Sequence, residues 1–509
     1  MQSLKNRWFM PAVVAVIAVV FIVRKPFFTN EMHSHDDCIF QSLVVYENWE
    51  QQGGGSFNWC PVQTWSNPGD KFHAHYARLV DQNGNNYYTS YPPLSFLFTY
   101  NMMHIFGLEI SKLSLHIIGF ILHIISSILL FLILLELIAG ERKYFAAFLG
   151  FCAYISSPVT QYFSHDILFP ELWGQVFWIA SVYYWLRVHQ NSGGYLRKFL
   201  FIFLIFIGLC VEWLSFFFAF SLWIHFIWNW RKAGGKWVRV FIPIVLVIAL
   251  AFATLWFSSL NGVQSYLKSL SIRFVERAGY FGANYSADGM HFLSLKTWVG
   301  LAWNHISSLM PWIAFFPVFL FALLMKMKFS LMQRKLLSLP WLLIWFPAFL
   351  YTFSLFNLSA THYHLVAKWM FPLSVFIGVA TDWTLRNFEG SRRLIMTAII
   401  VSFVSGFSIS LFLFSEKEKQ QAALSDTQVL KEIAFEISTT ASPFDAIFVE
   451  STPSCPNLQG PLTYMTKRNI VEVASMNDAK LRMIGIENPS ITMYYCQFDT
   501  LNRTCSCSR

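Results

Sequence analysis

Three acidic residues that border apolar segments are the first candidates for chemistry in this sequence. Asp36 and Asp37 stand where a short amphipathic helix is expected to begin, because apolar residues recur at helical spacing from Ile39 to Tyr46. Asp166 stands at the start of a later apolar run. A carboxylate within hydrogen-bond reach of a hydroxyl or an amine can take its proton and act as a general base. These residues therefore indicate a site at which a hydroxyl or an amine attacks a substrate.

Further polar residues border the same kind of apolar segment and would complete such a site. They are His165, Glu171, Glu212, His362, His364 and Lys368. Ionisable residues at or within a membrane cost free energy and are functional candidates by default. Carboxylates on one side and a lysine on the other suit a substrate whose leaving group is an anion. Arg273 and Arg277 add positive charge, although their spacing with Glu276 equally fits a surface helix with an internal ion pair.

Histidines near the first acidic pair raise the alternative of a metal site. His33 and His35 lie at alternate positions just before Asp36, and His73 and His75 repeat this spacing. Imidazole and carboxylate groups are ligands of divalent metals. Histidines in a polar loop are more often solvated, so a metal site and a solvated loop both stay open as interpretations.

The composition shows that these residues must be positioned by a membrane protein. The 509 residues are 55% hydrophobic and 18% aromatic, and only 13% are charged. The mean hydropathy is +0.46. A soluble domain does not need so much apolar sequence. The formal net charge of +9 does not indicate nucleic-acid binding, because the Lys and Arg residues sit in short loops between apolar runs, where they set membrane topology.

Apolar runs predict about eleven membrane-spanning helices. They cover residues 8–23, 113–138, 144–163, 167–186, 199–211, 213–230, 237–260, 305–325, 336–356, 365–383 and 394–414. The first run is not followed by a small-residue cleavage site, so we expect an uncleaved helix. The predicted fold class is an all-α polytopic membrane domain spanning residues 1–414.

Basic clusters fall in every second connection between these runs. They lie at residues 142–143, 187–198, 231–239, 326–335 and 386–393. The positive-inside rule assigns such loops to the cytoplasm. The N-terminus is then cytoplasmic as well. The opening loop of residues 25–112 and everything after Ser415 are expected on the opposite side, which is periplasmic or lumenal.

The opening loop closes with the segment Tyr91-Pro92-Pro93-Leu94. Tyr91 is expected to be extended, because a residue before a proline avoids the helical region, and Pro93 can open a helix. The helix expected from Leu94 to Phe106 is too short to cross a bilayer. We therefore expect it to lie in the membrane interface.

The sequence changes character after residue 414 and predicts a small extracytoplasmic α/β domain at residues 415–509. A charged helix is expected at 416–437 and short helices at 461–467 and 477–483, with strands at 445–450, 469–474 and 490–496. Strands separated by short helices are typical of a compact α/β arrangement.

Six of the eight cysteines fall on this outer side. They are Cys38, Cys60, Cys455, Cys496, Cys505 and Cys507. An even set in an oxidising compartment permits disulfides, and Cys38 with Cys60 is one candidate pair. The pairing within the tail stays open, and so does the alternative of free thiols.

The order of these features resembles the GT-C superfamily of glycosyltransferases. The likeness is greatest to the branch of protein O-mannosyltransferases and lipid A aminoarabinose transferases, and it extends over most of the chain. It rests on Asp36-Asp37, Tyr91-Pro92-Pro93-Leu94, Gly107, Ser156-Ser157-Pro158, Asp166, the segment from His364 to Pro372, and the carboxy-terminal α/β domain. The aminoarabinose branch usually has Lys before its Pro-Pro pair, where this chain has Tyr91, so a phosphate contact made by that Lys must come from another residue.

The resemblance implies that a sugar moves from a polyprenyl phosphate to an acceptor on the outer face, with inversion at the anomeric carbon. Asp36 would be the general base, and Asp37 or Asp166 would orient the acceptor or the sugar. Lys368, followed by Arg273 and Arg277, would contact the departing phosphate. Tyr91, Pro92, His165, Glu171, His362 and His364 would line the substrate site. The resemblance also favours a bacterial inner membrane.

Two other classes of function compete with this reading. A transporter or flippase could use buried acids as an ion relay, but such proteins tend to show internal repeats, and this sequence has no clear repeat. A membrane scaffold could use its outer domain only to bind partners.

Overall fold

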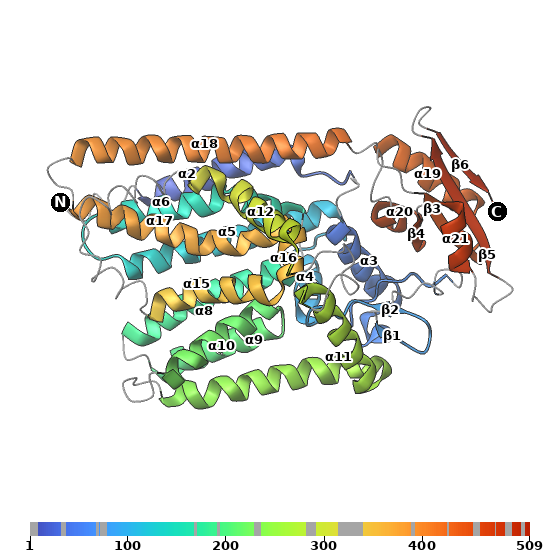
Figure 1. Ribbon diagram of the computed structural model, residues 1–509, viewed down its shortest axis with the longest axis horizontal. Coiled ribbons are helices and arrows are strands. Elements are labelled where there is room, and N and C mark those ends of the chain that lie inside the picture. Colours follow the sequence, from blue (N-terminus) through green and yellow to red (C-terminus); the bar gives the residue numbers. More distant parts are fainter. Residues whose placement is uncertain are drawn as a thin grey trace.

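A computed structural model describes most of the chain. The described residues are 9–31, 37–67, 71, 79–166, 170–190, 194–228, 236–280, 292–313, 339–387, 392–424, 427–450, 459–473, 475–483, 491–499 and 504–508. Helices dominate and run roughly parallel to the long axis of the molecule, with a small sheet at one end (Figure 1). We call this end, which also carries the opening loop, the module end.

Most of the predicted spans are helices of the bundle. Their bounds are α2 Phe9–Arg24, α5 Lys112–Leu137, α6 Lys143–Ser156, α8 Pro170–Gln190, α9 Tyr195–Leu209, α10 Trp213–Trp228, α11 Lys236–Ala278, α12 Leu295–Ile313, α15 Leu339–Ser354, α17 Ala367–Asn387 and α18 Arg392–Leu424. Within the described residues, five helices are long and apolar enough to cross a membrane, and further apolar helices are shorter. The protein is therefore an integral membrane protein, and the predicted number of eleven spans stays a prediction.

The predicted span at residues 144–163 is wrong in its extent. Helix α6 ends at Ser156, and α7 begins at Pro158 and runs to Asp166. Ser157 between them is extended, with φ −56° and ψ 131°. The physical reason is the proline, because the residue before a proline avoids the helical region.

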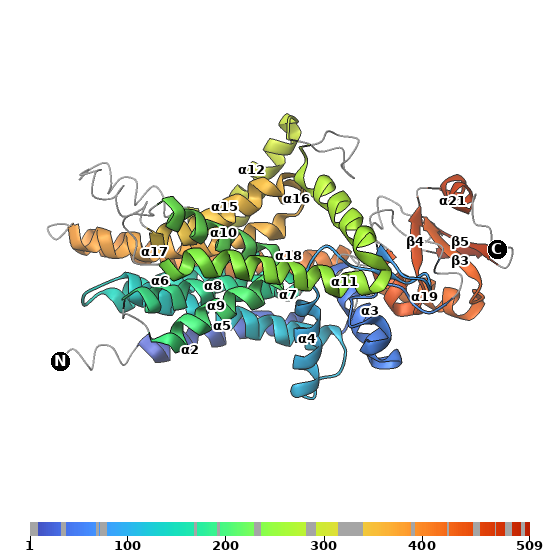
Figure 2. The same ribbon diagram turned by 90° about the horizontal axis from the view of Figure 1, so that it is seen from below.

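Helix α11 combines the predicted span that ends at residue 260 with a second helical segment. Asn261 and Gly262 have non-helical backbone angles, with φ 76° at Gly262. Glycine tolerates this conformation, so the chain can bend there without a steric penalty. The part after the bend turns away from the bundle and approaches α12 and α16 (Phe356–Thr361) (Figure 2).

The opening loop contains two helices and a short hairpin at the module end. Helix α3 spans Asp37–Gln52 and confirms the predicted helix start. Strands β1 (Leu79–Val80) and β2 (Asn86–Tyr87) pair antiparallel. Helix α4 spans Leu94–Ile105 with Pro93 at its N-cap, as predicted. Its place in a membrane interface stays a prediction.

The carboxy-terminal segment forms a four-stranded sheet with helices beside it (Figure 1). The strands β3 (Asp445–Glu450), β4 (Ile470–Val473), β5 (Thr492–Asp499) and β6 (Thr504–Ser508) have the order β4-β3-β5-β6. Strand β3 is parallel to β4 and β5, and β6 is antiparallel to β5. The helices are α19 (Thr427–Thr440), α20 (Gln459–Thr466) and α21 (Met476–Met483). We call this segment the α/β module.

Two details of the α/β module differ from the expectation. The single charged helix expected at 416–437 is wrong, because α18 continues to Leu424 and α19 is a separate helix. Strand β6 was not predicted, and a disulfide joins its Cys507 to Cys496 of β5. Among the predicted elements of this segment, β3 matches its expected bounds, and β4, β5, α20 and α21 lie within a few residues of theirs.

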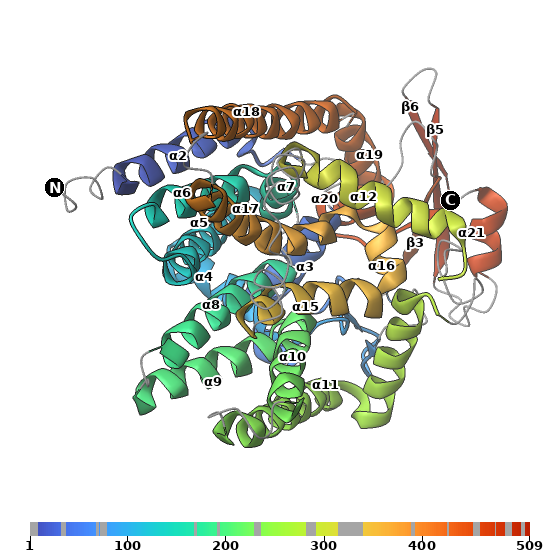
Figure 3. The same cartoon turned by 60° about the vertical axis from the view of Figure 1, so that its left-hand side comes forward.

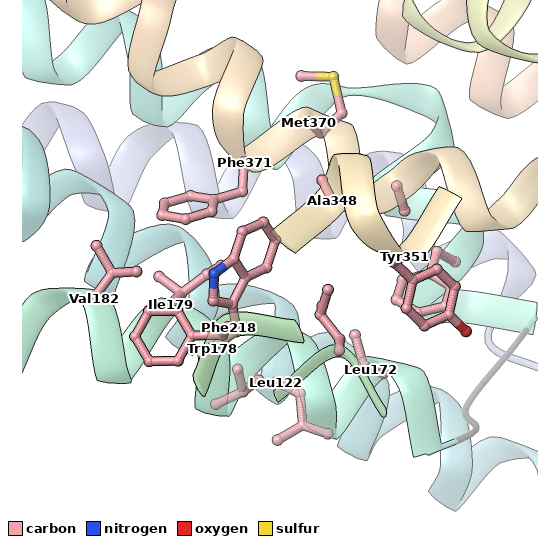
Figure 4. Packing of buried hydrophobic residues seen from close by; sticks show 14 of the residues in the cluster. Leu122, Leu172, Trp178, Ile179, Val182, Phe218, Ala348, Tyr351, Met370 and Phe371 are labelled. Atoms are coloured by element: carbon pink, nitrogen blue, oxygen red, sulfur yellow. The ribbon is translucent and has the colours of Figure 1, made fainter. Parts of the chain in front are cut away.

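The bundle core consists of apolar side chains from helices that are distant in the sequence. Helix α17 packs against α6, and α5 packs against α8 (Figure 3). Trp178 and Phe371 form an edge-to-face pair with ring centroids 4.8 Å apart. Tyr351 lies at the edge of this packed layer and points its hydroxyl away from it (Figure 4). A tightly packed interior of this kind holds its neighbours in fixed positions.

Candidate active site

A buried contact between the opening loop and the bundle begins the candidate site. Tyr91, just before α4, donates a hydrogen bond from its hydroxyl to Oε1 of Glu171. Glu171 lies in the first turn of α8, and both residues are buried. The Pro92-Pro93 pair that starts α4 limits how the backbone at Tyr91 can turn. Sequence and fold together thus bring a phenol and a carboxylate into one buried pair.

Arg277 brings a cation to the same pair. It lies in the last turn of α11, and its Nη2 donates to the Tyr88 hydroxyl over 3.3 Å. Its Cζ lies 5.4 Å from the ring centroid of Tyr91, a distance at which a guanidinium is attracted to an aromatic face. Burial raises the pKa of the Tyr88 hydroxyl, and the charge of Arg277 opposes that rise. Tyr88 is therefore a neutral hydrogen-bonding group at neutral pH.

A second carboxylate and a lysine complete the cluster. Glu212, between α9 and α10, is fully buried, and its Oε2 accepts from the backbone N–H of Leu214 over 2.6 Å. Lys368 in the first turn of α17 places Nζ 4.0 Å from Oε1 of Glu212 and 3.7 Å from the ring centroid of Tyr351. Burial raises the pKa of Glu212 to about 7, although the charge of Lys368 opposes the rise. The Glu212 carboxyl can therefore gain or lose a proton near neutral pH.

Unsatisfied polar atoms mark this cluster as a candidate site for a polar ligand or for water. Among the described residues, neither Nζ of Lys368 nor Oε2 of Glu171 has a hydrogen-bond partner, and both side chains are buried. Leaving such groups unpaired costs free energy comparable to a lost hydrogen bond or more. Lys368 also lies within electrostatic range of Glu171 and Arg277. We call Tyr88, Tyr91, Glu171, Glu212, Arg277, Tyr351 and Lys368 the charged cluster.

A further group of polar residues surrounds Arg24 at the end of α2. Arg24 is fully buried, and its Nη1 donates to Ser164 Oγ over 2.8 Å. Its Nη2 lies 3.5 Å from Nδ1 of His165. The His165 ring stacks on that of His116 with centroids 3.8 Å apart, and its Nε2 lies 3.9 Å from Glu418. The predicted site residue His165 therefore belongs to this group, which joins α2, α5, α7 and α18.

Several predicted site residues lie outside the part of the chain that the structure describes. These are Asp36, His33, His35 and Cys455. Asp37 begins α3, Asp166 ends α7 and Cys505 lies in β6, but their side chains are likewise outside it. Within the described residues, no group of three His, Cys, Asp or Glu side chains could hold a metal ion.

The other predicted residues have described surroundings. Arg273 pairs with Glu276 over 3.2 Å, which confirms the internal ion pair expected for this helix. His364 is buried with its ring stacked on Phe163, whereas His362 is exposed and its Nδ1 lies 2.7 Å from Thr361 Oγ1. The candidate disulfide between Cys38 and Cys60 does not form, because no bond joins their sulfur atoms. The buried thiol of Cys60 instead donates to the Asn58 carbonyl over 3.7 Å.

Sequence reasoning missed three contributors to these polar groups. Tyr88 and Tyr351 belong to no motif. An isolated tyrosine in a loop or an apolar helix is interpreted as an ordinary packing residue. Arg24 directly follows the first apolar run in the sequence, but it is buried among side chains of α5 and α7. In the sequence, the polar residues Ser164 and His165 next to Asp166 were the only sign that Arg24 has polar partners in α7.

Comparison with solved structures shows that nearly the whole chain has a known fold. ArnT from Cupriavidus metallidurans bound to undecaprenyl phosphate matches with a TM-score of 0.58 and 11% identity, over 96% of this chain and 94% of that chain. The oligosaccharyltransferase AglB from Archaeoglobus fulgidus, in complex with an inhibitory peptide and a dolichol-phosphate, matches with a TM-score of 0.57 and 12% identity. That match covers 97% of this chain and 70% of that chain.

A second structure of the Archaeoglobus fulgidus oligosaccharyltransferase, with Zn and sulfate, matches with a TM-score of 0.59 and 12% identity, over 96% of this chain and 67% of that chain. ArnT is a lipid A aminoarabinose transferase, and both proteins are GT-C superfamily members. The chain thus shares the fold of these GT-C proteins, as the resemblance of its sequence predicted. No family model and no curated protein matches the sequence.

Proposed function

We propose that this protein is an integral membrane glycosyltransferase. It moves a sugar from a polyprenyl-phosphate donor to a glycolipid, glycan or protein acceptor on the outer face of the membrane. The main support is the charged cluster, in which a buried lysine and a buried carboxylate each keep an unsatisfied polar atom. The GT-C fold adds support, because the neighbours ArnT and AglB were solved with undecaprenyl phosphate and a dolichol-phosphate.

The reaction follows from the chemistry of such a donor. A hydroxyl or amine of the acceptor attacks the anomeric carbon, and a new bond forms to that carbon. The bond from the anomeric carbon to the phosphate oxygen breaks on the opposite face, and its electron pair leaves with the phosphate. Asp36 accepts the proton of the attacking group, and Asp37 or Asp166 orients the acceptor or the sugar. The configuration at the anomeric carbon is inverted.

The departing phosphate needs positive charge close to it. Lys368 supplies it, because its ammonium is buried and only weakly engaged by Glu212 at 4.0 Å. Arg277 supplies a second charge, and the Tyr88 hydroxyl is positioned beside it. Charged donors in a site that excludes water stabilise developing negative charge more strongly than they would in water. The polyprenyl chain stays in the bilayer, which we propose is a bacterial inner membrane with the α/β module in the periplasm.

The test uses membranes that contain the full chain, a radiolabelled polyprenyl-phosphate sugar and candidate acceptor lipids. We expect the wild type to transfer label to an acceptor and Asp36→Asn to lose transfer by at least about 100-fold, because the base is removed. The matched control is Asp478→Asn, since Asp478 lies on α21 of the α/β module and forms an ion pair with Arg482 on the same helix. Full transfer by Asp36→Asn would remove the proposed base.

A further inference from the structure

Lys467 joins the α/β module to the opening loop. It follows α20 directly, and its Nζ forms an ion pair with Glu47 of α3. The same Nζ lies 3.9 Å from the ring centroid of Tyr464 and 5.1 Å from that of Trp65. One lysine side chain therefore contacts residues of both segments, and a cation over aromatic faces adds attraction to the ion pair.

Hydrogen bonds in the same place connect the two segments through their backbones. Trp65 Nε1 donates to the carbonyl of Thr463 over 3.1 Å, and Asn67 Nδ2 donates to the carbonyl of Lys467 over 3.2 Å. The partners are about 400 residues apart in the sequence. The phenol of Tyr464 lies beside the same Glu47 carboxylate, and burial together with this carboxylate raises the pKa of Tyr464. We call Glu47, Trp65, Asn67, Tyr464 and Lys467 the latch.

The backbone conformation at Lys467 is unfavourable for a lysine, and the contacts of its side chain offset this cost. Its φ is +55°, in the left-handed region. The residue after a helix often adopts this conformation, but glycine or asparagine is preferred there because a longer side chain is strained. A lysine at such a position accepts strain that glycine would avoid. The contacts of its ammonium with Glu47 and the two aromatic rings account for it.

The latch acts on the helix that carries the proposed catalytic acids. Helix α3 begins at Asp37, Asp36 precedes it, and Glu47 lies ten residues further along the same helix. Its residues from Ile39 to Tyr46 are mostly buried, so the helix is held as a rigid body. At about 1.5 Å per residue, Glu47 is roughly 15 Å from the helix start. Fixing Glu47 therefore fixes the axis of α3, and the acidic pair stands at the start of this helix in the sequence.

We propose that Lys467 and Glu47 are positioning residues, through which the α/β module holds α3 and its acidic pair in place for sugar transfer. This inference rests on the proposed function. Neither residue belongs to the charged cluster. Their effect is on the orientation of the base, and a displacement of about 1 Å at a reacting group can cost about 100-fold in rate.

The decisive variant is Lys467→Asn, because asparagine keeps the left-handed backbone and loses only the ammonium. We expect kcat for transfer to fall at least about tenfold, while KM for the polyprenyl-phosphate sugar changes less than about twofold. Lys467→Arg should restore most of the rate, since it retains the charge. The control is Arg482→Asn, which removes a cation from an ion pair between two residues of α21.

Hydrogen–deuterium exchange of the full chain gives a measurement that does not depend on activity. We expect the backbone amides in the first turn of α3 to exchange faster in Lys467→Asn and Glu47→Gln than in the wild type. In Arg482→Asn their exchange should equal that of the wild type. A wild type that transfers sugar, with Lys467→Asn equal to it in kcat and in exchange, would overturn the inference. A wild type that transfers no sugar would instead overturn the proposed function. If the exchange of Lys467→Asn then also equalled that of the wild type, the positioning role of the latch would be overturned as well.

Discussion

The hydroxyl of Tyr91 donates to the carboxylate of Glu171, and this buried bond ties the opening loop to the first turn of α8. In the aminoarabinose branch that the sequence resembles, a lysine is usual at the position of Tyr91. A phenol cannot supply the charge of that lysine, but it can orient a carboxylate. We therefore propose that Lys368 and Arg277, which lie in the same charged cluster, supply the positive charge.

The Tyr91→Phe variant tests this arrangement. It removes the donor to Glu171 and leaves a buried carboxylate oxygen without its partner. A hydrogen bond to a charged group contributes about 1.5–3 kcal/mol, so we expect kcat/KM for sugar transfer to fall roughly 10- to 100-fold. Tyr195→Phe is the matched control, because Tyr195 is exposed at the start of α9. Equal activity of both variants would show that the bond plays no part in transfer.

Lys368 is predicted to carry the largest single cationic contribution. Lys368→Met removes the charge and keeps the apolar stem, so a bound phosphate loses a partner and Glu212 loses its counter-charge. We expect transfer to fall at least about 100-fold, as for the loss of one donor to a developing oxyanion. Lys419→Met is the control, since Lys419 is exposed and pairs with Glu416 on the same helix.

The outcome for Lys368→Met separates two roles. Binding of labelled polyprenyl phosphate, measured in detergent without an acceptor, should weaken together with transfer if the ammonium contacts the phosphate. Retained binding with lost transfer would assign Lys368 to the electrostatics of Glu212 alone. Unchanged binding and transfer would remove it from the site.

Local sequence patterns predicted several helices and strands of the fold. The helix start at Asp37, the helix after Pro93 and the strand at 445–450 each follow from a proline, an amphipathic period or a β-branched run. Such signals act over a few residues, so they can be read without the fold. The same applies to Lys368 and Glu171, which stood out as ionisable residues beside apolar runs.

Partners far apart in the chain could not be predicted in this way. The bond from Tyr91 to Glu171 spans 80 residues, and the bond from Arg24 to Ser164 spans 140. Which residues meet depends on how the helices pack, and no local pattern encodes it. The pairing of Cys496 with Cys507 could not be predicted for the same reason. It depends on the register of β5 against β6, and β6 itself was not predicted.

Packing of α6 on α17 gives a prediction about stability. A Cβ at Gly150 would lie 2.7 Å from the backbone carbonyl oxygen of Ser374 and 2.5 Å from a methyl of Leu134. Small residues let membrane helices approach closely, and backbone atoms cannot move aside as a side chain can. We expect Gly150→Ala to destabilise the protein by about 1–3 kcal/mol, measured by thermal unfolding in detergent.

The control for this variant is Gly55→Ala, because nothing lies within 4 Å of a Cβ at that position. Its unfolding midpoint should stay close to that of the wild type. A Gly150→Ala protein as stable as Gly55→Ala would mean that α6 and α17 are not in close contact in the membrane.

The Glu212 carboxyl predicts how stability depends on pH. Burial raises its pKa from the ordinary 4.5 to about 7, so the folded protein holds a proton that the unfolded chain releases between these values. Stability from this group is fully present below pH 4.5, and it is lost as the pH rises through 7. The loss is on the order of 3 kcal/mol, because each unit of pKa difference corresponds to about 1.4 kcal/mol.

Glu212→Gln isolates this contribution, since the amide has the same shape and does not titrate. We expect the unfolding midpoint of the wild type to fall relative to that of Glu212→Gln as the pH is raised from 5 to 8. The difference between the two proteins, followed at several pH values, reports the proton bound by Glu212 and cancels other titrating groups. A constant difference across this range would mean that the carboxyl is already ionised at pH 5, with Lys368 outweighing burial.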